Sequence, residues 1–331
     1  MTSPRPAPAH RRATTVTTLV VPLVVLVATV AVAVAWTPRL PDPLAVHWSA
    51  SQAPDAFGSL KDAIAVPLLF VPVFALGMWA LAVRPGQDTS TRRMAAGLAT
   101  GLAVLMSVVV LGSLVVQLDL PDAADARGID LVLVGAFAGG ILAGVLVALV
   151  VPRDDPMPTE APVDPAAPRT ALTPGTEASW SRSVTSRAGA WFGGSVVLLN
   201  VGLAAALRTP ALLVLAAGLG VLLASMLVLR VRVDARGLVA RSALGWPAIR
   251  VPLDEVLAAR VTQVDPFGDF GGWGYRIGRG GRVGFVMRTG EGIEVERTGG
   301  RLHVVTVDDA ATGAALLNSL ADRARGGATA R

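Results

Sequence analysis

Six long runs of apolar residues, none of which contains a charged side chain, constrain this sequence more than any other feature. An apolar run of about 20 residues is long enough to cross a bilayer as a helix. Only 16% of the residues are charged, whereas an ordinary soluble domain has about 25%. The pattern predicts a membrane all-α helical bundle of six transmembrane helices. The runs are Ala13–Trp36, Ala63–Val83, Met94–Gln117, Leu131–Val151, Ala188–Leu207 and Pro210–Leu229.

Three of these runs allow a second interpretation. The first resembles a secretory signal peptide, with Ala31-Val32-Ala33 as a cleavage site. It is much longer than the roughly 7–15 apolar residues of such a signal, which favours a retained anchor. The last two runs are separated only by Arg208 and Thr209, so we expect a hairpin over 188–229. That hairpin either spans the membrane twice or is re-entrant.

The distribution of arginine predicts the orientation in the membrane. Arginines gather in 1–12, in 84–93 and in 152–187, whereas 119–130 is acidic. Basic loops remain on the cytoplasmic side. We therefore expect a multi-pass protein with both termini cytoplasmic and with loop 37–62 facing outward.

Composition divides the chain further. Residues 1–12 are basic and rich in proline, which predicts a disordered N-terminus, and 13–151 form a four-helix membrane unit. Residues 152–187 are rich in Pro, Ala, Thr and Ser with no apolar period, which predicts a flexible cytoplasmic linker. A membrane hairpin over 188–229 then leads to a cytoplasmic domain, 230–331.

The C-terminal domain is predicted to be mostly β, because apolar and polar residues alternate from Leu229 to Asp234 as in a half-buried strand. Asp308 or Asp309 can cap a final amphipathic helix that Gly326-Gly327 ends. Antiparallel strands followed by one helix resemble the bacterial pleckstrin-homology-like barrels, in which the helix plugs one end. Further strands are expected over 238–241, 249–253 and 301–307, and 282–288 and 293–297 are expected to pair as a hairpin.

The outward loop carries the most specific motif. It reads Leu40-Pro41, then His47-Trp48, then Asp55, Phe57, Gly58-Ser59 and Lys61. In this pattern, loop 40–61 resembles the domain-of-unknown-function 1648 family of bacterial membrane proteins. The chain departs from the family at Gln52, where glycine is usual, and at Leu60, which intervenes before the lysine. The resemblance implies a bacterial plasma membrane protein, in a family with members implicated in bacteriocin immunity and signalling.

The same loop holds the candidate ligand-binding residues. His47 is the residue there whose ordinary pKa lies near neutrality. Asp42 and Asp55 are candidate partners for His47 or Lys61, and Trp48 is a candidate anchor at the headgroup level. The alternative is that these side chains only fold the loop against the helix ends.

Small residues at four-residue spacing mark candidate helix contacts, since they let two helices approach closely. They are expected to pack helices within one chain, with dimerisation as the alternative. Asn200 is expected to hydrogen-bond a neighbouring helix. The glycines are Gly97, Gly101, Gly135, Gly139, Gly140 and Gly144.

The glycine-rich segment 268–284 misses the dinucleotide-binding spacing by one residue and lacks a βαβ context. We expect loops and turns there. Its aromatic and basic side chains are candidate contacts for anionic lipid headgroups. They are Trp273, Tyr275, Arg276, Arg279 and Arg282.

Other observations narrow the function. The chain has no cysteine, and its three histidines have no zinc-site spacing, so no metal or other cofactor is expected. The basic excess is not gathered on one soluble element with aromatics, which argues against nucleic acid. No catalytic cluster is visible, and the apolar runs lack the charges that ion-coupled transporters use. We expect a non-enzymatic envelope protein for sensing, signalling or immunity. The alternatives are an assembly scaffold that docks a protein partner on its β domain, and a transporter of an uncharged substrate.

Overall fold

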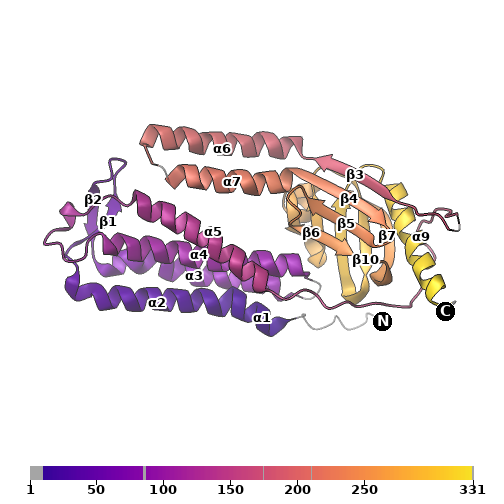
Figure 1. The fold of residues 1–331 in the computed structure, drawn as a ribbon, viewed down its shortest axis with the longest axis horizontal. Helices are drawn as coiled ribbons and strands as arrows, with labels where there is room; N and C mark the ends of the chain where they lie inside the picture. Colours follow the sequence, from indigo (N-terminus) through magenta and orange to yellow (C-terminus); the bar gives the residue numbers. More distant parts are fainter. Residues whose placement is uncertain (1–9, 85–86, 174, 210, 330–331) are drawn as a thin grey trace.

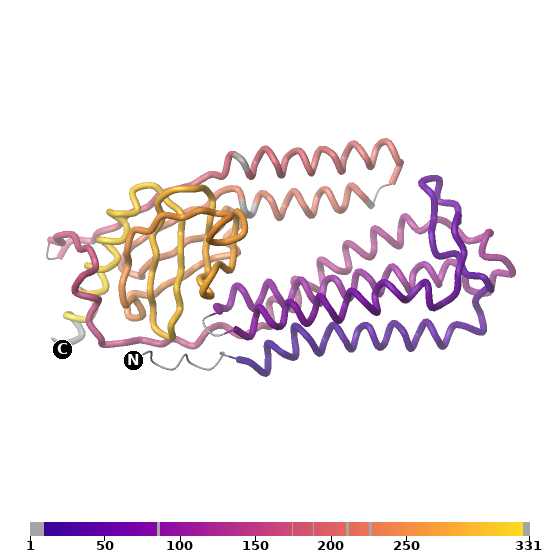
Figure 2. Tube along the Cα trace, turned by 180° about the vertical axis from the view of Figure 1, so that it is seen from behind, coloured from indigo at the N-terminus to yellow at the C-terminus, as the bar shows by residue number. Residues whose placement is uncertain are grey.

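The computed structural model describes residues 10–84, 87–173, 175–209 and 211–329. In Figure 1 the chain consists of two parts placed end to end, a bundle of helices and a sheet-rich domain. A small β-hairpin lies at the end of the bundle farthest from the sheets. The N-terminal end of the first helix lies at the sheet-rich end, as Figure 2 also shows from behind.

Five helices in the described chain are long and apolar enough to cross a membrane. They span Arg11–Arg39 (α1, Arg11–Thr15, and α2, Val21–Trp36, with the turns between and after them), Leu60–Ala82 (α3), Thr89–Val115 (α4), Asp130–Val150 (α5) and Gly189–Leu207 of α6 (Arg187–Leu207). The sixth predicted run forms the shorter helix α7, Ala211–Leu227. Its last two residues, 228 and 229, belong instead to a strand.

The helices turn large apolar side chains outward. Val27 is 67% exposed, Leu131 is 84% exposed and Trp191 is 82% exposed. In water such a surface would be unfavourable, whereas hydrocarbon accommodates it. The helical part is therefore a multi-pass membrane unit in a lipid bilayer.

Glycines set the contact between α4 and α5. A Cβ atom at Gly97 would lie 2.9 Å from the carbonyl oxygen of Gly144, and one at Gly101 would lie 2.9 Å from that of Gly140. The reciprocal distances, from Gly140 and Gly144, are 2.8 and 2.7 Å. Only residues without a side chain fit at this spacing. Gly135, by contrast, has no neighbouring atom within 4 Å of such a Cβ position.

The remaining two predicted packing residues have other surroundings. Gly139 has only Val104 nearby, 3.9 Å away. Asn200 donates its side-chain N–H to the carbonyl of Val196, 2.9 Å away and one turn back in α6. The expected hydrogen bond to a neighbouring helix is therefore replaced by one within the same helix, a common alternative for a short polar side chain.

The helical hairpin α6–α7 is inserted between two adjacent strands of one sheet. Strand β3 (Trp180–Thr185) leads into α6 through Ser186, and α7 continues directly into β4 (Val228–Asp234). β3 and β4 pair in antiparallel register. The N–H of Ser186 donates to the carbonyl of Leu227 at 3.0 Å. The membrane hairpin thus extends a β-hairpin.

Parts of the segment predicted to be a flexible linker, 152–187, pack onto the sheet-rich domain. Residues 180–185 are a strand, and Val163 and Ala167 are buried in the core of the sheet-rich domain. The N–H of Asp164 donates to the carbonyl of Leu257 at 2.9 Å. Composition predicted a solvated segment, but the segment satisfies its backbone against the domain that follows it in sequence.

Two sheets share one core. Leu229 of β4, Ile293 of β10 and Leu317 of α9 all belong to that core and are fully buried. The first sheet has the order β3-β4-β5-β6, and the second has the order β7-β10-β11-β9-β8. The remaining elements are β5 (Gly237–Ser242), β6 (Ala248–Val251), β7 (Val256–Val264), α8 (Pro266–Phe270), β8 (Gly274–Ile277), β9 (Val283–Val286), β10 (Gly290–Arg297), β11 (Arg301–Thr306) and α9 (Ala310–Thr329).

Several predictions for this domain are wrong in detail. The two sheets do not close into a barrel among the described strands. β9 and β10 do not pair as a hairpin, because β11 lies between them and pairs with β9 in parallel. The segment 268–284 contributes β8 and the start of β9 rather than loops alone. Helix α9 continues past Gly326 to Thr329.

Candidate functional site at the junction of helices and sheets

The first turn of α4 meets the sheet-rich domain through a buried carboxylate. Asp88 caps α4, accepting the N–H of Thr91 at 2.9 Å. The hydroxyl of Tyr275, on β8, donates to the same carboxylate oxygen at 2.6 Å. Nε2 of His303, on β11, lies 3.6 Å from the other oxygen. One helix cap therefore gathers groups from two strands.

A second carboxylate, Asp154, lies beside this cap on the segment after α5. Arg92 of α4 pairs with it at 2.8 Å and Arg301 of β11 at 3.6 Å. The N–H of Thr89 donates to it at 2.9 Å, and the hydroxyl of Thr89 accepts the N–H of Asp154 at 2.7 Å. The carboxylate thus links the bundle to the domain.

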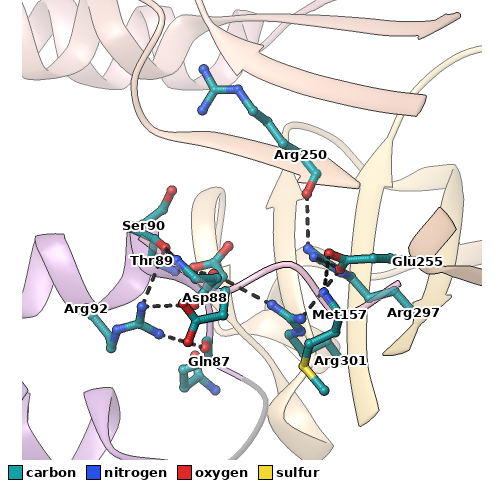
Figure 3. A network of polar contacts seen from close by, with 12 residues as sticks. Gln87, Asp88, Thr89, Ser90, Arg92, Met157, Arg250, Glu255, Arg297 and Arg301 are labelled. Atoms are coloured by element: carbon teal, nitrogen blue, oxygen red, sulfur yellow. Dashed lines mark hydrogen bonds and ion pairs between the residues drawn. The ribbon is translucent and has the colours of Figure 1, made fainter. Parts of the chain in front are cut away.

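Glu255 continues the chain of charges into the domain. Arg297 pairs with it and donates another N–H to the carbonyl of Arg250 at 3.0 Å. Arg301 lies 3.5 Å from the same carboxylate, and the N–H of Met157 donates to it at 3.0 Å. Figure 3 shows these side chains converging between the bundle and the sheets. We call Asp88, Arg92, Asp154, Glu255, Tyr275, Arg297, Arg301 and His303 the junction network.

The junction network balances its charges, with three carboxylates facing three guanidinium groups. The side chain of Arg92 is 2% exposed and that of Glu255 is 3% exposed. Buried ions are tolerated only when paired and hydrogen-bonded. Among the described residues, no cluster of His, Cys, Asp or Glu could hold a metal ion. The arrangement is suited to locking two parts together.

The pKa shifts of Asp88 and His303 agree with a network that joins the two parts of the protein. Burial raises the pKa of Asp88, but the interaction with His303 and the hydrogen bonds from Tyr275 and Thr91 outweigh it and lower the pKa to about 2. Burial lowers the pKa of His303, and the nearby Asp88 opposes this only in part. Asp88 is therefore ionised at neutral pH, while burial favours the neutral form of the His303 imidazole.

The opposite end of α4 holds the hairpin of β1 (Leu44–Trp48) and β2 (Pro54–Gly58). Gln117, two residues after the end of α4, is fully buried. Its amide oxygen accepts the N–H of Ala45 at 2.7 Å, and its amide nitrogen donates to the carbonyl of Ala45 at 3.0 Å. The amide thus binds the edge of β1 as a neighbouring strand would.

The predicted loop residues are only partly brought together. Nδ1 of His47 lies 2.5 Å from a carboxylate oxygen of Asp55, across the hairpin and exposed to solvent. Trp48 is buried, and its indole N–H donates to the carbonyl of Arg127 at 3.1 Å. Asp42 and Lys61 are exposed, and neither forms an ion pair with His47 in the described structure.

The five residues predicted to contact lipid headgroups fall into two groups, those paired within the protein and those exposed. Tyr275 belongs to the junction network, and Arg282 pairs with Asp269 at 3.2 Å and with Glu294 at 3.6 Å. Neither is free to meet a headgroup. Three of the five residues remain exposed, namely Trp273, Arg276 and Arg279.

Sequence reasoning missed most of the junction network. Asp88 before Thr89-Ser90-Thr91 is a recognisable helix cap. Its partners follow from no local pattern, because Tyr275 is 187 positions away. Gln117 gave no signal either, since an amide at a helix end is ordinary.

An apolar helical unit joined through buried ion pairs to a two-sheet domain defines the class, a multi-pass membrane protein with a sheet-rich domain. Residues 24–71, which cover most of α2, the β1–β2 hairpin and half of α3, match the family model described as Domain of unknown function (DUF1648). Neither the curated proteins nor the solved structures give a significant match to this chain.

Proposed function

We propose that this chain is a non-enzymatic protein of the bacterial plasma membrane that relays the state of an outward hairpin to a cytoplasmic domain. The observation that carries the proposal is that α4 is joined to the outward hairpin at one end and to the sheet-rich domain at the other. Gln117 binds β1 at one end, and Asp88 and Arg92 bind the sheet-rich domain at the other. The 27 residues of α4 span about 40 Å as a helix, enough to cross the hydrocarbon core.

The exposed pair of His47 and Asp55 is the proposed sensing feature of the hairpin. Both side chains are accessible, and the imidazole and carboxylate offer polar groups to a ligand or peptide. Trp48 and Gln117 bind the hairpin to the bundle beneath this pair. A ligand that shifts the hairpin would therefore act on the end of α4.

The arginine distribution supports the orientation. Arg92 and Arg93 begin α4 at the same end of the bundle as the sheets, and Arg187 begins α6 there. Basic segments next to helices remain cytoplasmic. We infer six spans, with α7 crossing as the partner of α6, and both termini inside.

Sidedness is tested by single cysteines, since the chain has none of its own. Ser51→Cys lies in the hairpin turn and Arg236→Cys in the β4–β5 turn, and both positions are exposed. In intact cells a membrane-impermeant thiol reagent should label the first variant and spare the second until the cells are opened. Labelling of Arg236→Cys from outside would place the domain beyond the cytoplasm and refute the relay.

A further inference from the structure

The sheet-rich domain adjoins the membrane helices without a spacer. Only Ser186 separates β3 from α6, and no residue separates α7 from β4. Thr185 pairs with Val228, so both strand ends lie at the level where the hairpin leaves the domain. This end of the domain therefore faces the headgroup layer of one leaflet.

Exposed apolar side chains gather at the same end. Ser242 pairs with Leu229, which places the turn after β5 beside the end of α7. In that turn Leu244 is 61% exposed and Trp246 is 41% exposed. Large apolar groups on this face are unfavourable in water and favourable at a membrane interface.

A second apolar pair lies near the start of α6. The rings of Phe267 and Trp273 meet edge to face, with centroids 4.8 Å apart. Phe267 is 61% exposed and Trp273 is 37% exposed. Trp273 also lines a pocket together with Ser186, Arg187 and Arg288. We call Leu244, Trp246, Phe267 and Trp273 the apolar rim.

The pocket is cationic. Arg187 is exposed and makes no hydrogen bond or ion pair with the described residues. Arg288 pairs with Asp308 at 2.5 Å and donates to the carbonyl of Thr289 at 3.1 Å, while its buried Nε has no hydrogen-bond partner in the described structure. α6 begins here with Ser186 as its cap, whose hydroxyl accepts the N–H of Gly189 at 3.1 Å, and the positive end of the helix dipole faces the same space.

We propose that this pocket binds the phosphate group of an anionic phospholipid from the adjoining leaflet, while the apolar rim inserts beside it. Arg187 supplies a charge that is unpaired among the described residues, and Arg288 and Thr289 complete the polar part of the lining. A phosphate at a helix N-terminus is also favoured by the helix dipole. The lipid would hold the sheet-rich domain against the membrane.

Position decides between a lipid and other occupants. The pocket lies where α6 enters the membrane, so a phospholipid headgroup reaches it without leaving its leaflet. The neighbouring rim is apolar, which suits the glycerol and upper acyl region and offers nothing to a free anion. The proposal does not depend on the relay, since it concerns only how the domain meets the leaflet.

The test uses the full chain, purified in detergent, stripped of lipid and examined by native mass spectrometry. The probes are phosphatidylglycerol and phosphatidylcholine with the same acyl chains. Phosphatidylglycerol should bind more tightly. Arg187→Gln and Arg288→Gln should each weaken its binding about fivefold, as expected for one basic residue near an anionic surface. Arg187→Lys should retain most of it.

Arg236→Gln is the matched control, because it removes the same charge from the distal β4–β5 turn. It should leave binding unchanged. Arg187→Gln keeps the test valid even if Arg288→Gln destabilises the fold by freeing Asp308. Equal binding of the two lipids, or wild-type binding by Arg187→Gln, overturns the proposal. Displacement of phosphatidylglycerol by an equal concentration of inorganic phosphate would identify a free-anion site and overturn it as well.

Discussion

Asp88 and Glu255 each lie where burial alone would favour a neutral carboxyl, yet each is met by hydrogen bonds or a guanidinium group, and Asp154 pairs with Arg92 beside them. Removing one partner of a buried ion pair typically costs about 3–5 kcal/mol, because the other charge is left uncompensated. Since the partners come from α4, the segment after α5, and the strands, no part of the network is complete alone. The residues of the network thus bind the helical bundle to the sheet-rich domain only when all of these segments are in place.

His303 should give the protein a stability that depends on pH. Burial lowers the pKa of His303 in the folded protein below its ordinary value of 6.5. Above pH 6.5 the imidazole is neutral in both states and contributes no pH dependence. Below pH 6.5 the unfolded chain binds the proton more readily, so the free energy of unfolding falls with falling pH. The measurement is chemical unfolding of the solubilised chain from pH 8 to pH 5.

The matched variant is His303→Gln, which keeps a polar side chain and cannot titrate. The groups that face the imidazole, Asp88, Arg297 and Arg301, remain in place. Below pH 6.5 the variant should lose less stability than the wild type. Parallel stability curves for the two proteins would show that His303 does not titrate differently on folding.

The sequence identifies some residues of these sites individually, but it does not predict the contacts between distant segments. The cap at Asp88 has a local signature, and Asp55 is a predicted partner of His47, although the sequence does not predict the β1–β2 hairpin that brings the two together. His303 looks like an ordinary strand residue, and Tyr275 lies in a segment predicted to form loops and turns. Their role arises because β8 and β11 bring them to α4, and pairing between distant segments leaves no trace in local pattern.

Among the secondary-structure elements, the close contact between α4 and α5 predicts the effect of single glycine substitutions on stability. Gly140→Ala would place its Cβ 2.8 Å from the carbonyl oxygen of Gly101 and 3.0 Å from the Cβ of Leu105. The helices must then separate, and overpacking of this kind costs about 1–3 kcal/mol. Thermal unfolding in detergent should show a lower midpoint for this variant.

Gly135→Ala is the control on the same helix, because nothing lies within 4 Å of its Cβ position. Alanine favours helix more than glycine does, so this variant should be neutral or slightly stabilising. Equal destabilisation by both substitutions would mean that helix propensity or membrane insertion, rather than the contact with α4, decides the result.

Elements with a strong local signal could be predicted, and the others could not. Long apolar runs gave the membrane helices, and strict alternation gave β4 and β5. β3 lies in a segment rich in proline and polar residues, which gives no strand signal. Its partner β4 follows in the sequence only after a 42-residue insertion, residues 186–227, which forms the membrane hairpin. The parallel pairing of β11 with β9 also depends on distant contacts.

In the molecule as a whole, segments that are far apart in the sequence meet at the junction network. The sheet-rich domain begins with β3, is interrupted by the membrane hairpin and resumes at β4. α4 enters the membrane from the junction network and leaves it at the β1–β2 hairpin. Two features thus tie the domain to the bundle, one through the continuous chain and one through buried charge.

The most direct test of the relay is hydrogen exchange measured by mass spectrometry on the chain in lipid nanodiscs. Gln117→Ala leaves the N–H and carbonyl of Ala45 without their partner. Phe57→Ala, on the exposed face of the hairpin, is the control. If the relay operates, only Gln117→Ala speeds exchange both in 44–58 and, at the other end of α4, in 87–92 and 301–306. Faster exchange confined to 44–58 would contradict the relay and leave the domain as a scaffold.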